Sequence, residues 1–271
     1  MRSALLSCHI LAKNSERRLA EVLRSVQPIS DEILIVDSGS TDRTMAIVNE
    51  FKCKALHRPF DNFRDQRTYA EENCEHDWVL VLDSDEVASK GLQKKIISLK
   101  ENSFSIENNA DVDGLTIKRD WYFINSPVQN FYTVKAPEFI AQQFNKKKIS
   151  HRNSRVIHEQ VDTRGAEIAA ISEWIHHHSC DSIDDLYAKI PIYARLSADD
   201  LHSQGIKSSR MKREIYPWMI WFRWYVLYMG FLDGRPGIIL GKYARDTIRT
   251  KYNNLAEIQN QTLRNDSPDG S

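Results

Sequence analysis

Residues 33–42 read ILIVDSGSTD and residues 78–86 read WVLVLDSDE, and these two stretches decide how the chain folds. Each is a short apolar run that ends on carboxylates, a pattern typical of a buried strand followed by a polar turn. Segments with helical spacing lie around them, among them 14–26 and 63–74. Because strands and helices alternate over residues 1–100, we predict an α/β fold with a mostly parallel central sheet and helices on both faces. Such sheets bind ligands beyond the carboxyl ends of their strands.

Apolar runs predict further strands at 4–11, 54–57, 156–161 and 168–175. The Ser40-Thr41 pair can cap a helix, and helical spacing recurs over 182–204. The polar stretch 102–113 is expected to be a loop, whereas 114–144 contains strand-like pieces. The second half of the chain therefore lacks the regular alternation of the first.

The composition is that of an ordinary globular protein and excludes several classes of function. The 271 residues include 37 basic and 37 acidic side chains, so the formal net charge is zero. A protein whose main partner is a nucleic acid needs a surplus of Lys and Arg, so we expect no nucleic-acid partner. The four cysteines form no CxxC pair, which argues against a zinc knuckle and fits a reduced compartment. We expect neither a signal peptide nor a clean membrane-spanning helix.

The acidic strand ends are the candidate site. Asp83 and Asp85 stand two apart, so both can turn toward one point if the strand ends between them. Paired carboxylates of this kind can hold a divalent cation together with the oxygens of a diphosphate. The cation would neutralise a leaving nucleoside diphosphate. The alternative interpretation is an ordinary polar turn, in which Asp and Ser are common.

On these motifs the chain resembles glycosyltransferase family 2, inverting enzymes with the Rossmann-like GT-A fold. The matches to the nucleotide half of that family are VDSGSTD over 36–42, the pair Gln66-Arg67 and LDSDE over 82–86. The matches to a subgroup that builds lipopolysaccharide core are VIHE over 156–159, HHS over 177–179 and GFLDGRPG over 230–237. The likeness covers most of residues 4–252. It departs from the family at residues 12–15, which read AKNS where many members have Thr-x-Asn-Glu.

The resemblance implies a role for each matching residue. Asp37 would accept a hydrogen bond from the imide of a uracil-type base, and its alternative role is to cap the turn. Asp85 would be the direct ligand of Mg²⁺ or Mn²⁺, and Asp83 would lie near the ribose or the metal. Arg67 would pair either with phosphate or with a carboxylate. Further candidates for the nucleotide pocket are Asn14, Asp65 and Gln66.

Inversion in a single displacement needs a base that deprotonates the acceptor hydroxyl. The resemblance assigns this catalytic role to Glu159, in the acceptor-side motif, and His158 is the alternative base. Arg152 and Arg155 are candidates for holding an anionic sugar or phosphate, and the alternative is that they are solvated surface charges.

Three consecutive histidines occupy 176–178 and raise the question of a metal site. Successive side chains of a strand point to opposite faces, so at most two of the three can share one site. No HExxH or further Cys/His spacing supports a closed zinc centre. His177 is the position that matches the family, and it could supply a further ligand to the metal or the diphosphate.

The stretch 215–232 is almost wholly apolar and aromatic, with basic residues on both sides. Residues 205–252 as a whole hold ten basic and three acidic side chains, a net charge of +7, so the rest of the chain carries −7. Trp and Tyr favour the headgroup boundary, and cations favour anionic lipid. Because Pro217 and Arg223 argue against a spanning helix, we expect a helix that lies in the membrane surface. The alternative is a helix packed on the catalytic domain or in a dimer contact.

The predicted organisation is a GT-A catalytic domain over 1–204, a basic aromatic helical extension over 205–252 and a disordered tail over 253–271. Within the catalytic domain, 1–100 is the nucleotide-sugar half and 101–204 the acceptor half. Composition alone supports the disordered tail, since most of its residues are polar.

The predicted function is that of a metal-dependent hexosyltransferase, which moves a hexose from a nucleotide diphosphate sugar. The expected hexose is glucose, and the expected nucleotide is UDP. The predicted acceptor is a lipid-anchored glycan such as lipopolysaccharide inner core. The predicted location is the cytoplasm, at the inner face of the cell membrane. The first alternative is transfer to a polyprenyl phosphate. Lower alternatives are a nucleotidyltransferase, which would need a glycine-rich loop after the first strand, and a non-catalytic membrane-surface protein.

Overall fold

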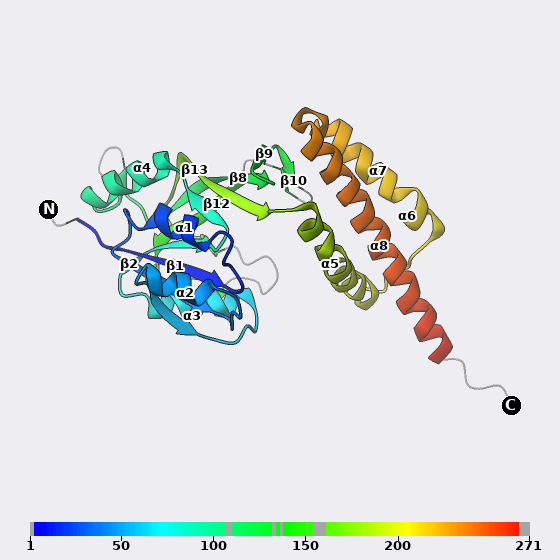
Figure 1. The fold of residues 1–271 in the computed structure, drawn as a ribbon, viewed down its shortest axis with the longest axis horizontal. Coiled ribbons are helices and arrows are strands. Elements are labelled where there is room, and N and C mark those ends of the chain that lie inside the picture. The colour runs from blue at the N-terminus through cyan, green and yellow to red at the C-terminus, as the bar shows by residue number, and fades with distance from the viewer. Residues whose placement is uncertain (1–2, 107–109, 132–133, 136–137, 154–160, 266–271) are drawn as a thin grey trace. The chain divides into compact units, whose positions relative to one another are not determined.

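The computed structural model describes residues 3–106, 110–131, 134–135, 138–153 and 161–265 (Figure 1). The chain forms two compact units. Unit 1 comprises residues 1–120 and 137–177, and unit 2 comprises residues 121–136 and 178–271. Strands β8 (Gly114–Phe123) and β13 (Ile168–Cys180) run from the first unit into the second.

Four parallel strands form the first half of the sheet, in the order β3-β2-β1-β4. They are β1 (Leu6–Ala12), β2 (Glu32–Asp37), β3 (Lys54–His57) and β4 (Trp78–Asp83). The order continues β12-β8-β13-β5, with β12 (Glu138–Asn145) and β5 (Glu86–Ala88). Strand β12 is antiparallel to both β4 and β8, and β13 is antiparallel to β5. The α/β class is therefore confirmed. Besides the four parallel strands, β8 and β13 run in the same direction, since Asp113 N–H donates to Glu167 at one end of the pair and Ile124 N–H donates to Cys180 at the other.

Helices cover both faces of the parallel strands. They are α1 (Leu19–Val26), α2 (Thr44–Glu50), α3 (Phe63–Asn73) and α4 (Lys90–Glu101). Cys8 and Ile10 of β1 pack with α1, α2 and α4 in one buried cluster, whereas Val79 and Val81 of β4 pack with α3 in another. This division follows from the strand period of two, because alternate side chains point to opposite faces.

Two local predictions are wrong. Helix α2 begins at Thr44, not at the Ser40-Thr41 pair, because Ser40 bonds to Asp37 and the Asp42 carboxylate accepts the Thr44 N–H at 2.9 Å. Within 102–113, expected to be a loop, β6 (Ser105–Ile106) and β7 (Ala110–Asp111) form a short antiparallel pair. The remaining short strands are β9 (Ser126–Val128), β10 (Asn130–Phe131) and β11 (Val134–Lys135). Most of the strand expected at 156–161 lies outside the described residues.

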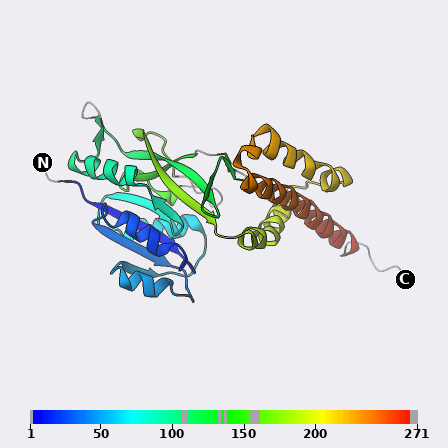
Figure 2. The ribbon, with the colours of Figure 1, turned by 45° about the horizontal axis from the view of Figure 1, so that its top comes forward.

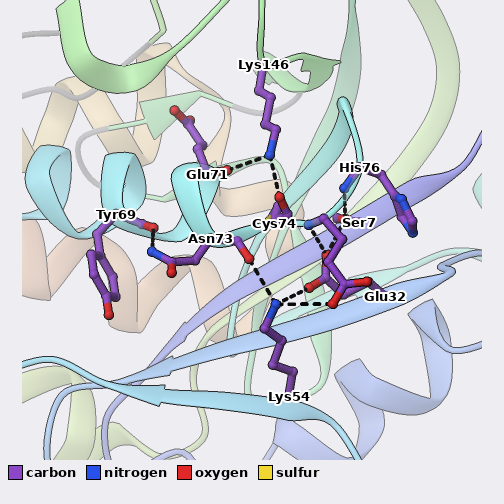
Figure 3. A network of polar contacts seen from close by, with 10 residues as sticks. Ser7, Glu32, Lys54, Tyr69, Glu71, Asn73, Cys74, His76 and Lys146 are labelled. Carbon is purple, nitrogen blue, oxygen red and sulfur yellow. Dashed lines mark hydrogen bonds and ion pairs between the residues drawn. The ribbon is translucent and has the colours of Figure 1, made fainter.

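The amino ends of the parallel strands are closed by a network of polar contacts (Figure 3). The buried Glu32 carboxylate accepts hydrogen bonds from the Ser7 hydroxyl, from Lys54 Nζ at 3.0 Å and from the Glu75 N–H at 2.6 Å. Lys146 Nζ donates to the carbonyl of Glu71 at 3.0 Å. Side chains from β1, β2, β3 and the loop before β4 are thereby joined at the edge of the sheet opposite the strand carboxyl ends.

Unit 2 is built mainly of helices, namely α5 (Ile183–Ser203), α6 (Arg210–Glu214), α7 (Tyr216–Phe222) and α8 (Arg235–Asn265). Figure 2 shows α7 lying along α8, and Ile220, Ala244 and Ile248 pack in one buried cluster between them. A π-helical turn η3 (Arg223–Leu227) and a 3-10 turn η4 (Gly230–Asp233) join α7 to α8. A Cβ at Gly237 would lie 1.7 Å from the Gly230 carbonyl oxygen, so this turn requires glycine there.

Two features of unit 2 differ from the predicted organisation. Helix α8 continues to Asn265, so residues 253–265 are helical and not a disordered tail, because Leu255 and Ile258 are buried in the same cluster as Ile248. Helix α5, assigned to the catalytic domain by sequence, packs against α8 and belongs to unit 2. None of the helices within the described residues is long and apolar enough to cross a membrane.

Candidate active site

The carboxyl ends of β1, β2 and β4 lie side by side. Ala12 of β1 is paired with Asp37 of β2, and Leu11 of β1 is paired with Asp83 of β4. Asp37 and Asp83 are therefore two strands apart, a separation of about 10 Å. The structure thus brings both predicted acidic strand ends to one edge of the sheet.

The loop after β1 is tied to the loops after β2 and β4. Asn14 has a positive φ of 51°, which asparagine tolerates, and its Oδ1 accepts the Thr41 N–H at 2.8 Å. Its own N–H donates to Ser40 Oγ at 2.9 Å. Ser15 Oγ donates to Ser84 Oγ at 2.8 Å. Asn14 therefore orders the edge of the candidate site by joining two loops.

The Asp37 carboxylate closes the turn that follows β2. It accepts hydrogen bonds from the N–H groups of Gly39 and Ser40, at 3.0 and 3.1 Å, and from the Ser40 hydroxyl. His57 Nδ1 lies 3.8 Å from the same carboxylate. The alternative role in capping the turn is therefore observed. Recognition of a nucleotide base by Asp37 stays a prediction.

Asp83 and Asp85 flank the point at which β4 ends, as the sequence pattern required. Asp83 Oδ1 lies 2.7 Å from a terminal nitrogen of Arg67, and Asp85 Oδ2 lies 3.4 Å from His177 Nε2. Burial alone would raise the pKa of Asp83, but the positive charges of Arg67, His177 and Arg119 outweigh it and hold the pKa below its usual range. About a third of each carboxylate side chain is exposed, 34% for Asp83 and 35% for Asp85.

Glu86 holds this acidic turn in place, and sequence reasoning assigned it no role. Its buried carboxylate accepts the Asp83 N–H at 3.0 Å, Arg119 at 3.0 Å and Gln142 Nε2 at 2.8 Å. The partners come from β8 and β12, in stretches of sequence without a motif. Only the position of Glu86 inside the quoted LDSDE segment could have pointed to it.

Gln66 and Arg67 project from α3 toward the same edge. The buried Gln66 amide donates to the carbonyls of Arg58 and Pro59, at 3.1 and 2.9 Å, and so fixes the β3–α3 loop. Arg67 pairs with a carboxylate, which is one of the two partners expected for it. Asp65 bonds to Arg64 and Asn62, and these contacts lower its pKa to about 2.

The three histidines of β13 alternate between faces, as a strand requires. His176 Nδ1 lies 2.9 Å from Asp120, and the His178 ring contacts the Tyr122 ring in a tilted arrangement, with 4.8 Å between the centroids. His177 points the other way, to Asp85. Burial alone would lower the pKa of His177, but the negative charge of Asp85 outweighs it and raises the pKa. His177 is thus the histidine that reaches the candidate site.

Two further predictions concern the acceptor side. The predicted base Glu159, its alternative His158 and Arg155 lie outside the described residues. Arg152 is described: its side chain is 69% exposed and pairs with Glu72.

The metal set Asp83, Asp85 and His177 is brought together only in part. Within the described stretches, no group of three or more His, Cys, Asp and Glu side chains is arranged to hold a metal ion. Asp85 and His177 are in contact, and the carboxylate oxygens of Asp85 are of the donor type that Mg²⁺ and Mn²⁺ prefer. Asp83 is engaged by Arg67.

The fold and this edge define an α/β protein whose ligand side is lined with carboxylates from the ends of β2 and β4. The chain belongs to glycosyl transferase family 2, because the model of that family matches residues 7–154. An uncharacterised glycosyltransferase of Rickettsia conorii is 32% identical over 245 residues, which are 86% of this chain and 83% of that protein. The chain is accordingly a glycosyltransferase that uses a nucleotide sugar.

Two more distant similarities complete the comparison. The lipopolysaccharide core biosynthesis glycosyltransferase LpsC of Rhizobium meliloti is 26% identical over 251 residues, 86% of this chain and 88% of that protein. The crystal structure of S. aureus TarS 1-349 covers 95% of this chain and 92% of its own, at 16% identity and a TM-score of 0.45. A structural likeness this distant says nothing about substrate.

Proposed function

We propose that this protein transfers a hexose from a UDP-sugar to a lipid-anchored glycan of the lipopolysaccharide inner-core type, and that glucose is this hexose. The transfer inverts the configuration at the anomeric carbon. The observation that carries the proposal is the acidic turn Asp83–Glu86, fixed by Arg67, Arg119 and Gln142 at the edge where Asp37 also lies. A donor diphosphate needs a fixed, partly exposed site of this kind, because preorganised groups cost no rearrangement during the reaction.

Asp85 and His177 are the side chains that would hold Mg²⁺ or Mn²⁺, with Asp83 beside them. When bound, the ion would neutralise charge on the departing diphosphate. Arg67 would orient Asp83, and Glu86 would keep the backbone of the turn in place through the Asp83 N–H. Asp37, Asn14 and Gln66 would frame the nucleoside.

The transfer itself needs one proton to leave the acceptor. The acceptor oxygen forms the new bond to the anomeric carbon, the bond from that carbon to the diphosphate breaks, and the hydroxyl proton goes to Glu159. Support for Glu159 comes from its place in the acceptor-side motif at 156–159. The similarity to LpsC supports a lipopolysaccharide core acceptor.

A donor screen tests the proposal. The full chain is titrated with UDP, GDP, CDP and dTDP, with and without Mn²⁺, and the thermal unfolding temperature is recorded. Transfer is then measured from the matching sugar nucleotides to lipopolysaccharide core and, in a separate arm, to a polyprenyl phosphate. We expect UDP to stabilise the protein and core glycan to be glycosylated. Stabilisation by none of the diphosphates would contradict the proposal, and transfer to polyprenyl phosphate alone would replace the acceptor.

We also propose that unit 2 holds the enzyme peripherally at the inner face of the cell membrane. Large apolar residues are exposed along α6, α7, η3 and the residue between α6 and α7. This apolar stripe is made by Met211, Ile215, Trp218, Met219, Phe222 and Leu227. Each of these side chains is at least 49% exposed. Basic residues accompany the stripe in the sequence, among them Arg210, Lys212 and Arg213. An apolar face with cations beside it suits the headgroup region of an anionic bilayer.

Vesicle sedimentation tests this location. We expect the full chain to bind vesicles with anionic lipid and to bind neutral vesicles less. The double variant Phe222→Ser, Leu227→Ser should lose most of this binding. Each methylene that is no longer buried in the bilayer removes about 0.8 kcal/mol of membrane-binding free energy. Phe60→Ser removes an equally exposed phenylalanine from unit 1 and is the control. Unchanged binding of the double variant would contradict the proposal.

A further inference from the structure

The outer face of α3 carries a cavity that the proposed donor site does not use. Its volume is about 410 Å³. It is lined by Arg58, Arg64, Asp65, Thr68, Tyr69, Glu72 and Arg152. Arg64, Thr68 and Glu72 are spaced by four residues along α3 and so share one helix face. Arg58 comes from the β3–α3 loop and Arg152 from η2 (His151–Asn153). Neither Asp37, Asp83 nor Asp85 belongs to this lining.

Three guanidinium groups from three separate segments converge on the cavity. Arg58 donates hydrogen bonds to the Asp65 carbonyl at 2.8 Å and to the Asp61 carboxylate at 2.6 Å. Its guanidinium carbon lies 5.0 Å from the centre of the Tyr69 ring. Arg64 Nε is held by Asp65 at 2.7 Å. Arg152 pairs with Glu72 through one terminal nitrogen. Each group is positioned in advance by a neighbouring carboxylate.

The pairing leaves donors for a ligand. A guanidinium carries five N–H donors, and the contacts to described residues use two in Arg58 and one each in Arg64 and Arg152. Planar donors in this number suit the oxygens of a carboxylate or a phosphate. The buried Oγ1 of Thr68 has no hydrogen-bond partner among the described residues, so the lining also offers a hydroxyl.

The cavity is large enough to hold more than a bare anion. Pockets that hold small organic ligands have volumes of about 300–1,000 Å³, and this cavity lies in that range. The Tyr69 side chain adds an apolar surface to a lining that is otherwise polar. An anionic group with a polar ring attached matches all of these features.

We propose that this cavity binds a sugar that bears an anionic substituent, a carboxylate or a phosphate. The assignment of that sugar to the glycan acceptor rests on the proposed function, whereas the binding itself does not. Arg64 and Arg152 contact the anionic group, and Thr68 and Tyr69 contact the ring.

Calorimetric titration of the full chain tests the inference. The probes are glucose 6-phosphate, glucuronate, glucose and inorganic phosphate. We expect at least one anionic sugar to bind about tenfold or more tightly than both glucose and inorganic phosphate. The tighter of glucose 6-phosphate and glucuronate identifies the substituent. Equal binding of glucose, or of inorganic phosphate, would overturn the proposal.

Matched variants place the binding in the cavity. The double variant Arg64→Gln, Arg152→Gln should weaken the anionic sugar about tenfold or more. The control Lys147→Gln, Lys148→Gln removes the same charge from side chains that are 70% and 64% exposed outside the cavity, and should bind as the wild type does. If the double variant does not fold, Arg152→Gln alone serves, because that side chain lies largely in solvent. Equal weakening by the control, or none by the cavity variants, would overturn the proposal.

The donor screen and these titrations together separate this inference from the proposed function. UDP binding and sugar transfer report on the donor site, and the anionic sugar reports on the cavity. If the full chain binds the anionic sugar but transfers no sugar from any donor, the result counts against the proposed function alone. UDP binding without any anionic sugar binding counts against the cavity alone.

Discussion

The two ends of the parallel strands use the same kind of side chain for opposite purposes. At the amino ends, Glu32 is 6% exposed and its carboxylate is shared among Ser7, Lys54 and the Glu75 N–H (Figure 3). At the carboxyl ends, Asp83 and Asp85 are about one-third exposed, and each is held on one side by a basic side chain, Arg67 or His177. A carboxylate with all its partners inside the protein stabilises the fold, whereas one held on a single side remains open to a ligand.

The difference has a physical basis in hydrogen-bond satisfaction. A buried carboxylate must be paired and hydrogen-bonded, because leaving it unpaired costs several kcal/mol. Glu32 meets that condition within the chain. In the acidic turn, only the buried Glu86 carboxylate has its partners within the protein, and these include Arg119 and Gln142. The comparison predicts that substitutions at the carboxyl ends affect transfer and that substitutions at the amino ends affect stability.

The largest effect is expected from Asp85→Asn. This change removes the charge that faces His177 and, on our proposal, the metal ion, so sugar transfer should fall about a thousandfold, equivalent to about 4 kcal/mol. The free energy of unfolding should change by less than about 0.5 kcal/mol, because the side chain is partly exposed. Diphosphate release and urea unfolding measure the two quantities. Full transfer by the variant would refute the role of Asp85.

The next effect is expected from Glu32→Gln at the opposite edge. Loss of the charge weakens three hydrogen bonds at a buried position, so the free energy of unfolding should fall by about 2–3 kcal/mol. Transfer per folded molecule should stay within about twofold of the wild type. The control Glu75→Gln alters a side chain that is 63% exposed and should cost less than about 1 kcal/mol. If both variants lost the same free energy of unfolding, the stabilising role assigned to the buried Glu32 would be wrong.

The same carboxylate predicts a pH dependence of stability. Burial alone would raise the pKa of Glu32, but hydrogen bonds from Ser7, Glu75 and Lys54 outweigh it and hold the pKa below the ordinary 4.5. The stabilisation is therefore complete above pH 4.5 and is lost as the pH falls through the lower, folded-state pKa. Urea unfolding of wild type and Glu32→Gln from about pH 7 to about pH 3 should show their difference shrinking toward the acid end. A constant difference would mean that ionisation of Glu32 is not its source.

The smallest effect is expected from Ser15→Ala. The Ser15 hydroxyl ties the β1 loop to Ser84 in the acidic turn, so its loss should lower transfer about three- to tenfold and stability by about 1 kcal/mol. Ser3→Ala removes an exposed hydroxyl from the same segment of chain and should have neither effect. A change in stability alone would assign Ser15 to the fold and not to the site.

The alternation of strands and helices over residues 1–100 was predictable because it depends on local periodicity. Apolar runs bounded by polar turns identified all four parallel strands to within two residues. The same patterns placed Asp37, Asp83 and Asp85 at strand ends, and a parallel sheet brings such ends to one edge. Family membership followed from those motifs, and the match over 7–154 confirms it.

Tertiary structure alone decided how each carboxylate is used. Motif resemblance had placed Arg67 and His177 near the acidic turn, but only the structure shows the pairs that form. Arg67 pairs with Asp83, Arg119 with Glu86 and His177 with Asp85. Helix α8 extends to Asn265 because Leu255 and Ile258 find a buried face on neighbouring helices, which the polar composition of the tail did not indicate. Periodicity determines which side of an element is buried, whereas sheet order and helix packing determine which residues meet there.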